Sequence, residues 1–211
     1  MGPKQRYYEN VAKTIIENLE KRQMKGFYCR DSIDAIDKVR SLIPEGSSVS
    51  WGGSVTLQET GIMDTLIDGE YEVLDRDMAV TREQQKEIYG RISVCDWFLT
   101  SSNAITLDGE LVNVDNRGNR VSYLCFGPDN VIVVVGINKI VANVDEGISR
   151  ARNIAAPPNV LRLGRNTPCA VTGKCENCLS PDCICAQTVI TRRSTYPGRI
   201  NVIIVGEELG Y

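Results

Sequence analysis

Strand-like and helix-like segments alternate along most of this chain, and this alternation restricts the folds open to it more than any other feature. Residues 131–135 are an unbroken β-branched run, Val-Ile-Val-Val-Val, which is typical of a strand buried on both faces. Residues 31–43 carry apolar side chains at helical spacing, and residues 94–101 form a second apolar run. Strands that alternate with helices form parallel sheets covered on both faces. We therefore predict an α/β fold with an open, mostly parallel twisted sheet and helices on both faces.

The length of the chain allows one sizeable core. With 211 residues and 42% apolar content, residues 1–211 are expected to form a single domain. Apolar residues at helical spacing predict an N-terminal helix within residues 1–25. Another helix, over residues 145–155, should end at Pro157-Pro158, because proline lacks the N–H that continues a helix.

Charge and hydropathy exclude two classes of partner. The net charge is −3, and no basic run is interleaved with aromatic residues, so we expect no nucleic-acid binding. No apolar run approaches the roughly 18 residues that a membrane span needs, so we expect no membrane span and a cytoplasmic location. The sequence leaves open whether the chain forms a homo-oligomer.

The chain contains no histidine, which removes the commonest general base and the commonest metal ligand. Catalytic triads built on histidine are therefore excluded. Acid–base chemistry would need a carboxylate, lysine, tyrosine or cysteine, and a transition metal would need mainly thiolate ligands.

An apolar strand runs into two adjacent glycines over residues 49–61, Val-Ser-Trp-Gly-Gly-Ser-Val-Thr-Leu-Gln-Glu-Thr-Gly. Gly52 and Gly53 can adopt positive φ and approach a ligand closely, and Ser54 can cap the helix that follows. Free N–H groups at a helix start attract anions. A tight turn without a ligand is an equally good interpretation, because the stretch matches neither the dinucleotide fingerprint nor a Walker loop.

Ligands of parallel sheets bind beyond the carboxyl ends of the strands. Ser101-Ser102-Asn103 and Gly136-Ile137-Asn138-Lys139 both follow predicted strands, so both should lie near the glycine turn. Lys139 could reach an anion there, although a solvated surface lysine is as common. The candidates for binding a small anionic ligand are Gly52, Gly53, Ser54, Thr56, Asn103, Asn138 and Lys139.

Residues 103–116 contain Asp108-Gly109 flanked by alternating apolar residues, the strongest short-range signal for a hairpin. Many polar side chains crowd this hairpin, and they serve either turn chemistry or a site. Glu59, Asp108 and Glu110 are the candidate catalytic carboxylates, as base or nucleophile.

Eight cysteines divide into two groups. Cys29, Cys95 and Cys125 fall singly in strand-like stretches and are expected to be small buried apolar residues. The other five lie within residues 164–185, a loop inserted before strands expected at 188–192 and 201–205; they are Cys169, Cys175, Cys178, Cys183 and Cys185.

Clustered thiols in a reducing compartment favour metal binding over disulfides. The C-x2-C pair of Cys175 and Cys178 is the firmest part of the pattern. The expected ligands are Cys169, Cys175, Cys178 and Cys185, with Cys183 as an alternative fourth. An iron–sulfur cluster of four irons is favoured over zinc, because zinc commonly uses two separated C-x2-C pairs and only one is present. Free redox-sensitive thiols are the remaining alternative.

The sequence resembles the lactate-utilisation (LUD) domain family, the LutC/YkgG-like proteins. The matching stretches are SWGGSVTLQETG, DWFLTSSNAITLDGELVNVD, GNRV, VIVVVGINKIV and the closing VIIVGEELG. The resemblance implies an open α/β fold shared with glucosamine-phosphate deaminase, ribose-phosphate isomerase and CoA-transferases. It also implies a role in oxidising lactate to pyruvate alongside iron–sulfur partners. The small LUD subunit of that system need not carry its own cluster, so the cysteine segment suggests a separate, stand-alone branch.

Three hypotheses follow from these features. The first is a redox component that binds lactate or a related hydroxy acid and passes electrons from an iron–sulfur cluster to an electron-transfer partner. The second is an isomerase or transferase that binds a sugar phosphate or CoA ester and carries a structural zinc, which is an analogy of fold only. The third is a metal-stabilised binding module without catalysis.

Overall fold

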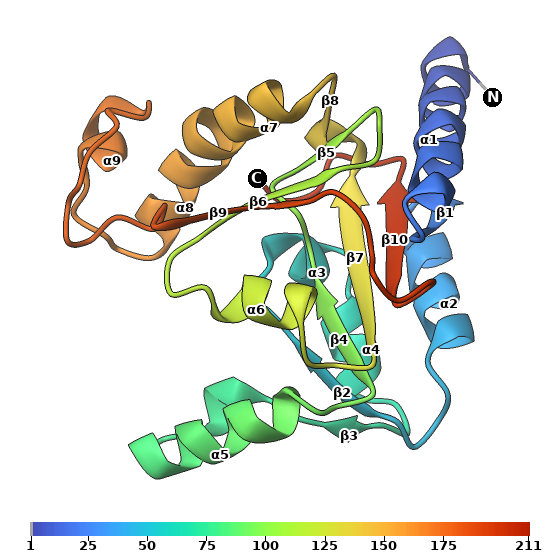
Figure 1. The fold of residues 1–211 in the computed structure, drawn as a ribbon, viewed down its shortest axis with the longest axis horizontal. Coiled ribbons are helices and arrows are strands. Elements are labelled where there is room, and N and C mark those ends of the chain that lie inside the picture. The colour runs from blue at the N-terminus through green and yellow to red at the C-terminus, as the bar shows by residue number, and fades with distance from the viewer. Residues whose placement is uncertain (1) are drawn as a thin grey trace.

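The computed structural model describes residues 2–211 and contains a six-stranded sheet at its centre (Figure 1). All five strand pairings in this sheet are parallel. The predicted open, parallel α/β sheet is therefore confirmed. The strand order is β1 (Lys25–Cys29), β10 (Ile200–Val205), β7 (Asn130–Gly136), β4 (Trp97–Thr100), β2 (Ser48–Trp51) and β3 (Glu72–Val73).

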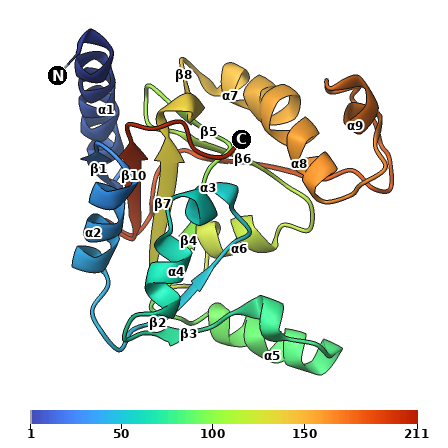
Figure 2. The same cartoon turned by 180° about the vertical axis from the view of Figure 1, so that it is seen from behind.

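Strand β7 shows why the sheet is covered on both faces. Its residues alternate between two apolar cores, with Val131, Val133 and Val135 in one and Ile132 and Val134 in the other. The first core includes α1 (Pro3–Lys21), α5 (Arg82–Ile92) and α6 (Asn119–Cys125). The second includes α2 (Ser32–Leu42), α3 (Val55–Glu59) and α4 (Ile62–Ile67), which Figure 2 shows from behind.

A smaller four-stranded sheet stands beside the main one, in the order β8 (Ile140–Val141), β5 (Ala104–Thr106), β6 (Leu111–Asp115) and β9 (Gln187–Thr191). Strands β5 and β6 form the predicted hairpin, and Gly109 in its turn has a φ of +87°. Strand β9 pairs antiparallel with β6, whereas the sequence suggested that it would rejoin the main sheet. Of the two late strands, β10 alone returns to the main sheet.

The prediction that a helix would end at Pro157-Pro158 is wrong. Helix α7 (Val144–Arg150) continues through a π-helical segment, Ala151–Ala155, into α8 (Ala156–Arg162). Pro157 and Pro158 lie in the first turn of α8. The π-helical turn before them is wider and shifts the hydrogen-bonding register, so the helix needs no N–H from these two residues. A short helix, α9 (Pro168–Thr172), then opens the cysteine-rich segment, farthest from α1 in Figure 1.

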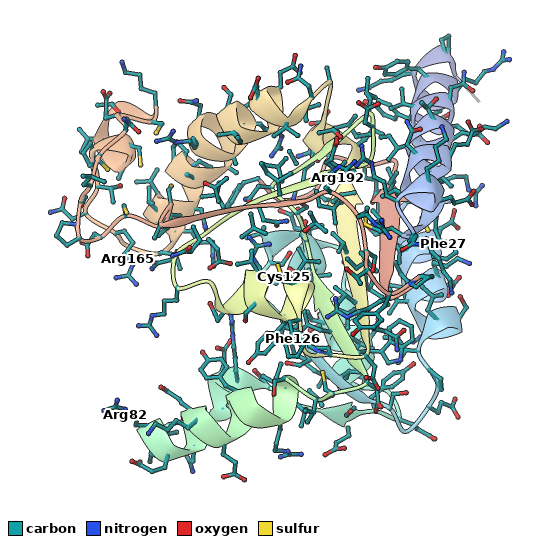
Figure 3. All side chains as sticks on the ribbon, viewed as in Figure 1. Phe27, Arg82, Cys125, Phe126, Arg165 and Arg192 are labelled. Atoms are coloured by element: carbon teal, nitrogen blue, oxygen red, sulfur yellow. The ribbon has the colours of Figure 1, made fainter. Side chains whose placement is uncertain are left out.

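Several smaller expectations need correction. The N-terminal helix predicted for residues 1–25 ends at Lys21, and Met1 lies outside the described residues. Helix α4 was not predicted; it begins after Gly61, whose φ of +72° separates it from α3. Cys125, labelled in Figure 3, is exposed at the end of α6 and not buried in a strand. Within residues 2–211, no helix is long and apolar enough to cross a membrane.

Candidate functional site

A cavity of about 250 Å³ lies beyond the carboxyl ends of strands β2, β4 and β7. The segments that follow these strands supply Gly53, Ser101 and Lys139 to its wall. The predicted proximity of the glycine turn to the segment after β4 is confirmed, since the Gly52 N–H also donates to the Leu99 carbonyl at 2.9 Å. Of the seven predicted ligand-binding residues, five line the cavity: Gly53, Ser54, Thr56, Asn103 and Lys139.

The two glycines are needed for close packing, and not for the positive φ that we predicted. Neither appears among the residues with positive φ. A Cβ on Gly52 would lie 2.8 Å from Cγ of Arg120, and a Cβ on Gly53 would lie 3.0 Å from Nη2 of Arg76. Ser54 caps α3 as predicted, because its hydroxyl accepts a hydrogen bond from the Leu57 N–H at 3.3 Å. The side chains of Arg120 and Arg76 therefore pack directly against the backbone of Gly52 and Gly53.

The partly buried side chain of Arg120 holds several segments of the cavity wall together. Its Nε donates to Asp115 Oδ2 at 3.1 Å, and Nη1 donates to the Ser101 carbonyl at 2.7 Å and to Asn113 Oδ1 at 2.6 Å. Its Nη2 donates to the Val114 carbonyl at 3.2 Å. Because its N–H groups are used in holding β6 and the end of β4 together, Arg120 contributes charge to the cavity and has few donors left for a ligand.

Lys139 is buried, with 3% of its surface exposed, at the end of a single 3-10 turn after β7. Its Nζ donates to Thr56 Oγ1 at 2.6 Å and to Ser101 Oγ at 3.0 Å. Burial lowers the pKa of Lys139 to about 7, with smaller contributions from the charges of Arg150 and Arg120 and opposition from Glu59. The amine is therefore held among hydroxyls and guanidinium groups.

Arg150 and Asn138 fix the segments around Lys139. Arg150 donates from Nε to the Asn138 carbonyl at 3.0 Å and from Nη1 to the Asn103 carbonyl at 2.6 Å. Asn138 does not line the cavity; its side chain accepts from the Leu209 N–H at 3.1 Å and donates to the Gly210 carbonyl at 3.3 Å. These two hydrogen bonds hold residues 209–211 beside Thr56, and Tyr211 forms part of the cavity wall.

The structure does not bring the predicted carboxylates together in the cavity. Asp108 and Glu110 lie in the β5–β6 hairpin, where Arg22 forms an ion pair with Glu110 at 2.7 Å and donates to the Asp108 carbonyl. Glu59 lies nearer, because its charge acts on Lys139, but its carboxylate accepts the Gly210 N–H at 2.6 Å. Asp115 is the acidic residue in the described wall of the cavity.

The cavity wall carries an excess of positive charge. Among the described residues that line it, Arg76, Arg120 and Arg162 are cationic and Lys139 is cationic when protonated, whereas Asp115 has the one acidic side chain. The guanidinium of Arg76 has no hydrogen-bond partner within residues 2–211 and only a 3.6 Å ion pair with Asp77. Neither Arg76 nor Arg162 was predicted as a site residue, since each is an isolated arginine far from the glycine turn in the sequence. The arrangement suits a ligand with at least one negative charge.

The cysteine-rich segment reaches the same cavity through Ile184 and Cys185. Cys169 and Cys185 pack with α8 in a small apolar cluster that includes Val160 and Ile184. Burial raises the pKa of Cys185 to about 11, and the charges of Cys175, Cys183 and Cys169 act in the same direction. Cys169 and Cys185 therefore lie together at α8, although they stand at opposite ends of the cysteine-rich segment.

The C-x2-C pair forms a turn docked on the π-helical segment. Asn177 has a φ of +49°, and its N–H donates to Cys175 Sγ at 3.4 Å. Asn153 accepts the Cys175 N–H at 3.2 Å, and Arg152 donates to Asn177. Among residues 2–211, no three Cys, Asp or Glu side chains converge in a geometry that could hold a metal ion. The donor chemistry fits a thiolate-bound metal or cluster, since an N–H directed at sulfur stabilises a thiolate.

The comparison with protein families identifies the relatives of this chain. The family model described as the LUD domain matches residues 12–205, which contain both sheets and the described cavity wall except for Tyr211. The chain belongs to the LUD domain family. The resemblance seen in the sequence motifs is thus confirmed, and the protein is related to lactate utilisation. No curated protein matches the sequence.

A solved structure shares the fold of this LUD domain over nearly the whole chain. A DUF162 family protein from Deinococcus radiodurans matches at 15% identity with a TM-score of 0.55, over 94% of this chain and 98% of that chain. Ribose 5-phosphate isomerase from Plasmodium falciparum matches at 16% identity and a TM-score of 0.35, over 53% of this chain and 52% of that one. Ribose 5 phosphate isomerase A from Neisseria gonorrhoeae matches at 10% identity and a TM-score of 0.34, over 63% and 65% respectively.

Proposed function

We propose that this LUD protein binds lactate or a related small hydroxy acid in the Lys139 cavity and acts as a redox component with an iron–sulfur cluster on its cysteine-rich segment. The observation that carries the proposal is that Lys139 and Cys185 line the same cavity. An acid bound by Lys139 would thus lie beside the segment that supplies the thiolates.

The cavity offers suitable groups for a hydroxy acid. Arg76 has donors left for a carboxylate, and a planar guanidinium can bind both carboxylate oxygens. The hydroxyls of Thr56 and Ser101 and the amine of Lys139 form a polar group that can hydrogen-bond a 2-hydroxyl or a 2-keto oxygen.

The cluster would be held by Cys169, Cys175, Cys178 and Cys185, with Cys183 as the alternative to one of them. Such a cluster, when bound, supplies one-electron transfer. Its electron acceptors would be iron–sulfur electron-transfer proteins. Support comes from the packing of Cys169 and Cys185 in one apolar cluster and from the N–H that Asn177 directs at Cys175.

The test uses protein purified without oxygen. We expect iron and acid-labile sulfide in equal amounts, a visible absorption band that dithionite bleaches, and binding of lactate measured by calorimetry. Lys139→Met should weaken lactate binding by about tenfold or more, because it removes a hydrogen-bond donor to an anionic ligand. Lys86→Met on the exposed side of α5 is the matched control and should behave as wild type. One zinc per chain and no sulfide would contradict the redox role.

The excess of cations favours a second candidate, a binding site for a phosphorylated sugar or a CoA ester with a structural zinc. Three of the four cationic residues in the cavity wall, namely Arg76, Lys139 and Arg162, have no carboxylate of their own in that wall. A dianion would neutralise more of this charge than lactate does. Protection against thermal unfolding by sugar phosphates or CoA esters, with none by lactate or pyruvate, would favour this candidate.

A further inference from the structure

Lys139 is a buried amine that lacks the usual partner of a buried lysine. Within residues 2–211, no carboxylate lies within ion-pair distance of its Nζ, and its two hydrogen-bond acceptors are the hydroxyls of Thr56 and Ser101. The charged groups that act on it are Arg150, Arg120 and Glu59, of which two are positive. A protonated lysine is therefore poorly stabilised at this position.

The neighbouring Arg120 shows what a structural cation looks like in the same site. Arg120 has Asp115 as its counter-ion and directs its other N–H groups at carbonyl and amide oxygens. Lys139 has neither a counter-ion nor a third acceptor among the described residues. A neutral amine has two N–H groups and one lone pair, so the two hydroxyls satisfy both donors and leave the lone pair free.

The electrostatics agree with a neutral amine. Burial, together with the charges of Arg150 and Arg120, lowers the pKa of Lys139 to about 7, so a large fraction of the amine is unprotonated at neutral pH. Lysines desolvated next to other cations are activated as nucleophiles toward carbonyl groups.

We propose that Lys139 is a catalytic nucleophile that condenses with a 2-oxo acid to form an imine, while Arg76 binds the carboxylate of that acid. The inference rests on the proposed binding of small hydroxy acids in this cavity, since a 2-oxo acid is the oxidised form of a 2-hydroxy acid and has the same carbon skeleton. Arg76 is suited to the carboxylate because it lines the cavity with its hydrogen-bonding groups unused.

The covalent step needs no oxidant or reductant. The lone pair of Nζ attacks the keto carbon, a C–N bond forms, and the π electrons of the carbonyl move to oxygen, which takes a proton. The nitrogen loses both of its protons, one to this oxygen and the second to the hydroxyl that results, which leaves as water, so that a C=N bond remains. The Thr56 and Ser101 hydroxyls, 2.6 and 3.0 Å from Nζ, are placed to relay these protons. Amine and ketone thus give imine and water.

The test traps the imine on the whole protein. Pyruvate and sodium borohydride should add one unit with the mass of pyruvic acid less one oxygen atom, and peptide mapping should place it on Lys139. Lactate has no carbonyl group and should give no adduct. Mapping of the wild-type protein localises the adduct without any variant, so the test does not depend on a variant that folds.

Three variants sharpen the assignment. Lys139→Arg keeps a long basic side chain but removes the primary amine and should abolish trapping, whereas Lys86→Arg should not change it. Arg76→Met should reduce trapping of pyruvate by about tenfold or more and leave trapping of the uncharged pyruvamide nearly unchanged, because only the carboxylate needs the guanidinium.

The outcomes separate this inference from the proposed function. Calorimetry on the same preparation, without borohydride, measures binding of lactate and pyruvate. Binding without an adduct on Lys139, or an adduct spread equally over exposed lysines, would overturn the imine and leave the proposed function standing. No binding and no adduct would overturn both. An adduct on Lys139 in protein that holds zinc and no iron would support the imine and remove the redox role.

Discussion

Gly52 and Arg120 pack so closely that a Cβ on Gly52 would lie 2.8 Å from Cγ of Arg120. This contact fixes the aliphatic part of Arg120 against the glycine turn while its guanidinium holds Asp115 and the Ser101 carbonyl. The shape of the cavity therefore depends on a residue with no side chain. Two consequences for stability can be measured.

Gly52→Ala should destabilise the fold by about 1–3 kcal/mol, because the new methyl group displaces Arg120 from its hydrogen bonds. The change is measured by urea denaturation. Gly90→Ala is a matched control, since Gly90 lies in α5 with no atom within 4 Å of a built Cβ. It should stabilise the protein by about 0.5–1 kcal/mol through helix propensity. Equal effects of the two substitutions would contradict the packing argument.

Asp115→Asn should cost about 3–5 kcal/mol of unfolding free energy, because it leaves the buried charge of Arg120 without its counter-ion. The side chains of this pair are 13% and 8% exposed. The pair of Arg91 and Glu72 is the control, with side chains 50% and 58% exposed, and Glu72→Gln should cost less than about 1 kcal/mol. The two variants are compared by chemical denaturation at the same pH. A small loss for Asp115→Asn would show that solvent reaches Arg120.

Local patterns predicted much of the fold. The β-branched run of β7 predicted a strand buried on both faces, and the Asp108-Gly109 turn predicted the hairpin, because both signals depend on neighbouring residues. The helix was wrongly predicted to end before Pro157, because a π-helical turn changes which backbone N–H groups the helix needs as donors. The pairing of β9 with β6 joins segments far apart in the sequence and leaves no local signal.

The candidate site was predicted in part for the same reason. Thr56 and Lys139 were identified because each lies just beyond a predicted strand, where ligands of parallel sheets bind. Arg76 comes from a single 3-10 turn, and its isolated side chain has no sequence signature. Nor did the sequence indicate that Cys185 would line the cavity, since this contact depends on how the cysteine-rich segment folds back from α8.

Lys139 should give the stability of the protein a distinctive pH dependence. Its pKa is lowered from 10.5 to about 7 in the folded state, so the unfolded chain binds more protons above pH 7. Stability should therefore rise as the pH increases from about 7, with a slope of up to about 1.4 kcal/mol per pH unit from this group. Lys139→Met should lack this contribution, and Lys86→Met should keep it.

The stabilities of wild type and Lys139→Met are compared only up to about pH 8.5, because cysteines begin to titrate there in the unfolded chain. Burial raises the pKa of Cys29 to about 11 and that of Cys95 to about 12, so ionisation of these thiols on unfolding lowers stability at higher pH. The difference between wild type and Lys139→Met is measured at several pH values by urea denaturation. If that difference is independent of pH, Lys139 keeps its ordinary pKa.

Metal binding at the cysteine-rich segment should depend on thiols that are far apart in its sequence. Cys178→Ser and Cys185→Ser should each remove most of the iron and sulfide from protein purified without oxygen, because a cluster with a missing thiolate ligand is poorly held. Cys125→Ser is the control, since Cys125 is exposed on α6, outside this segment, and should leave the metal content unchanged. Metal and sulfide analysis, together with the melting temperature, checks each variant. If Cys185→Ser keeps its full metal content while Cys178→Ser does not, Cys183 takes the place of Cys185 as a ligand, and Cys185 faces the cavity as a free thiol.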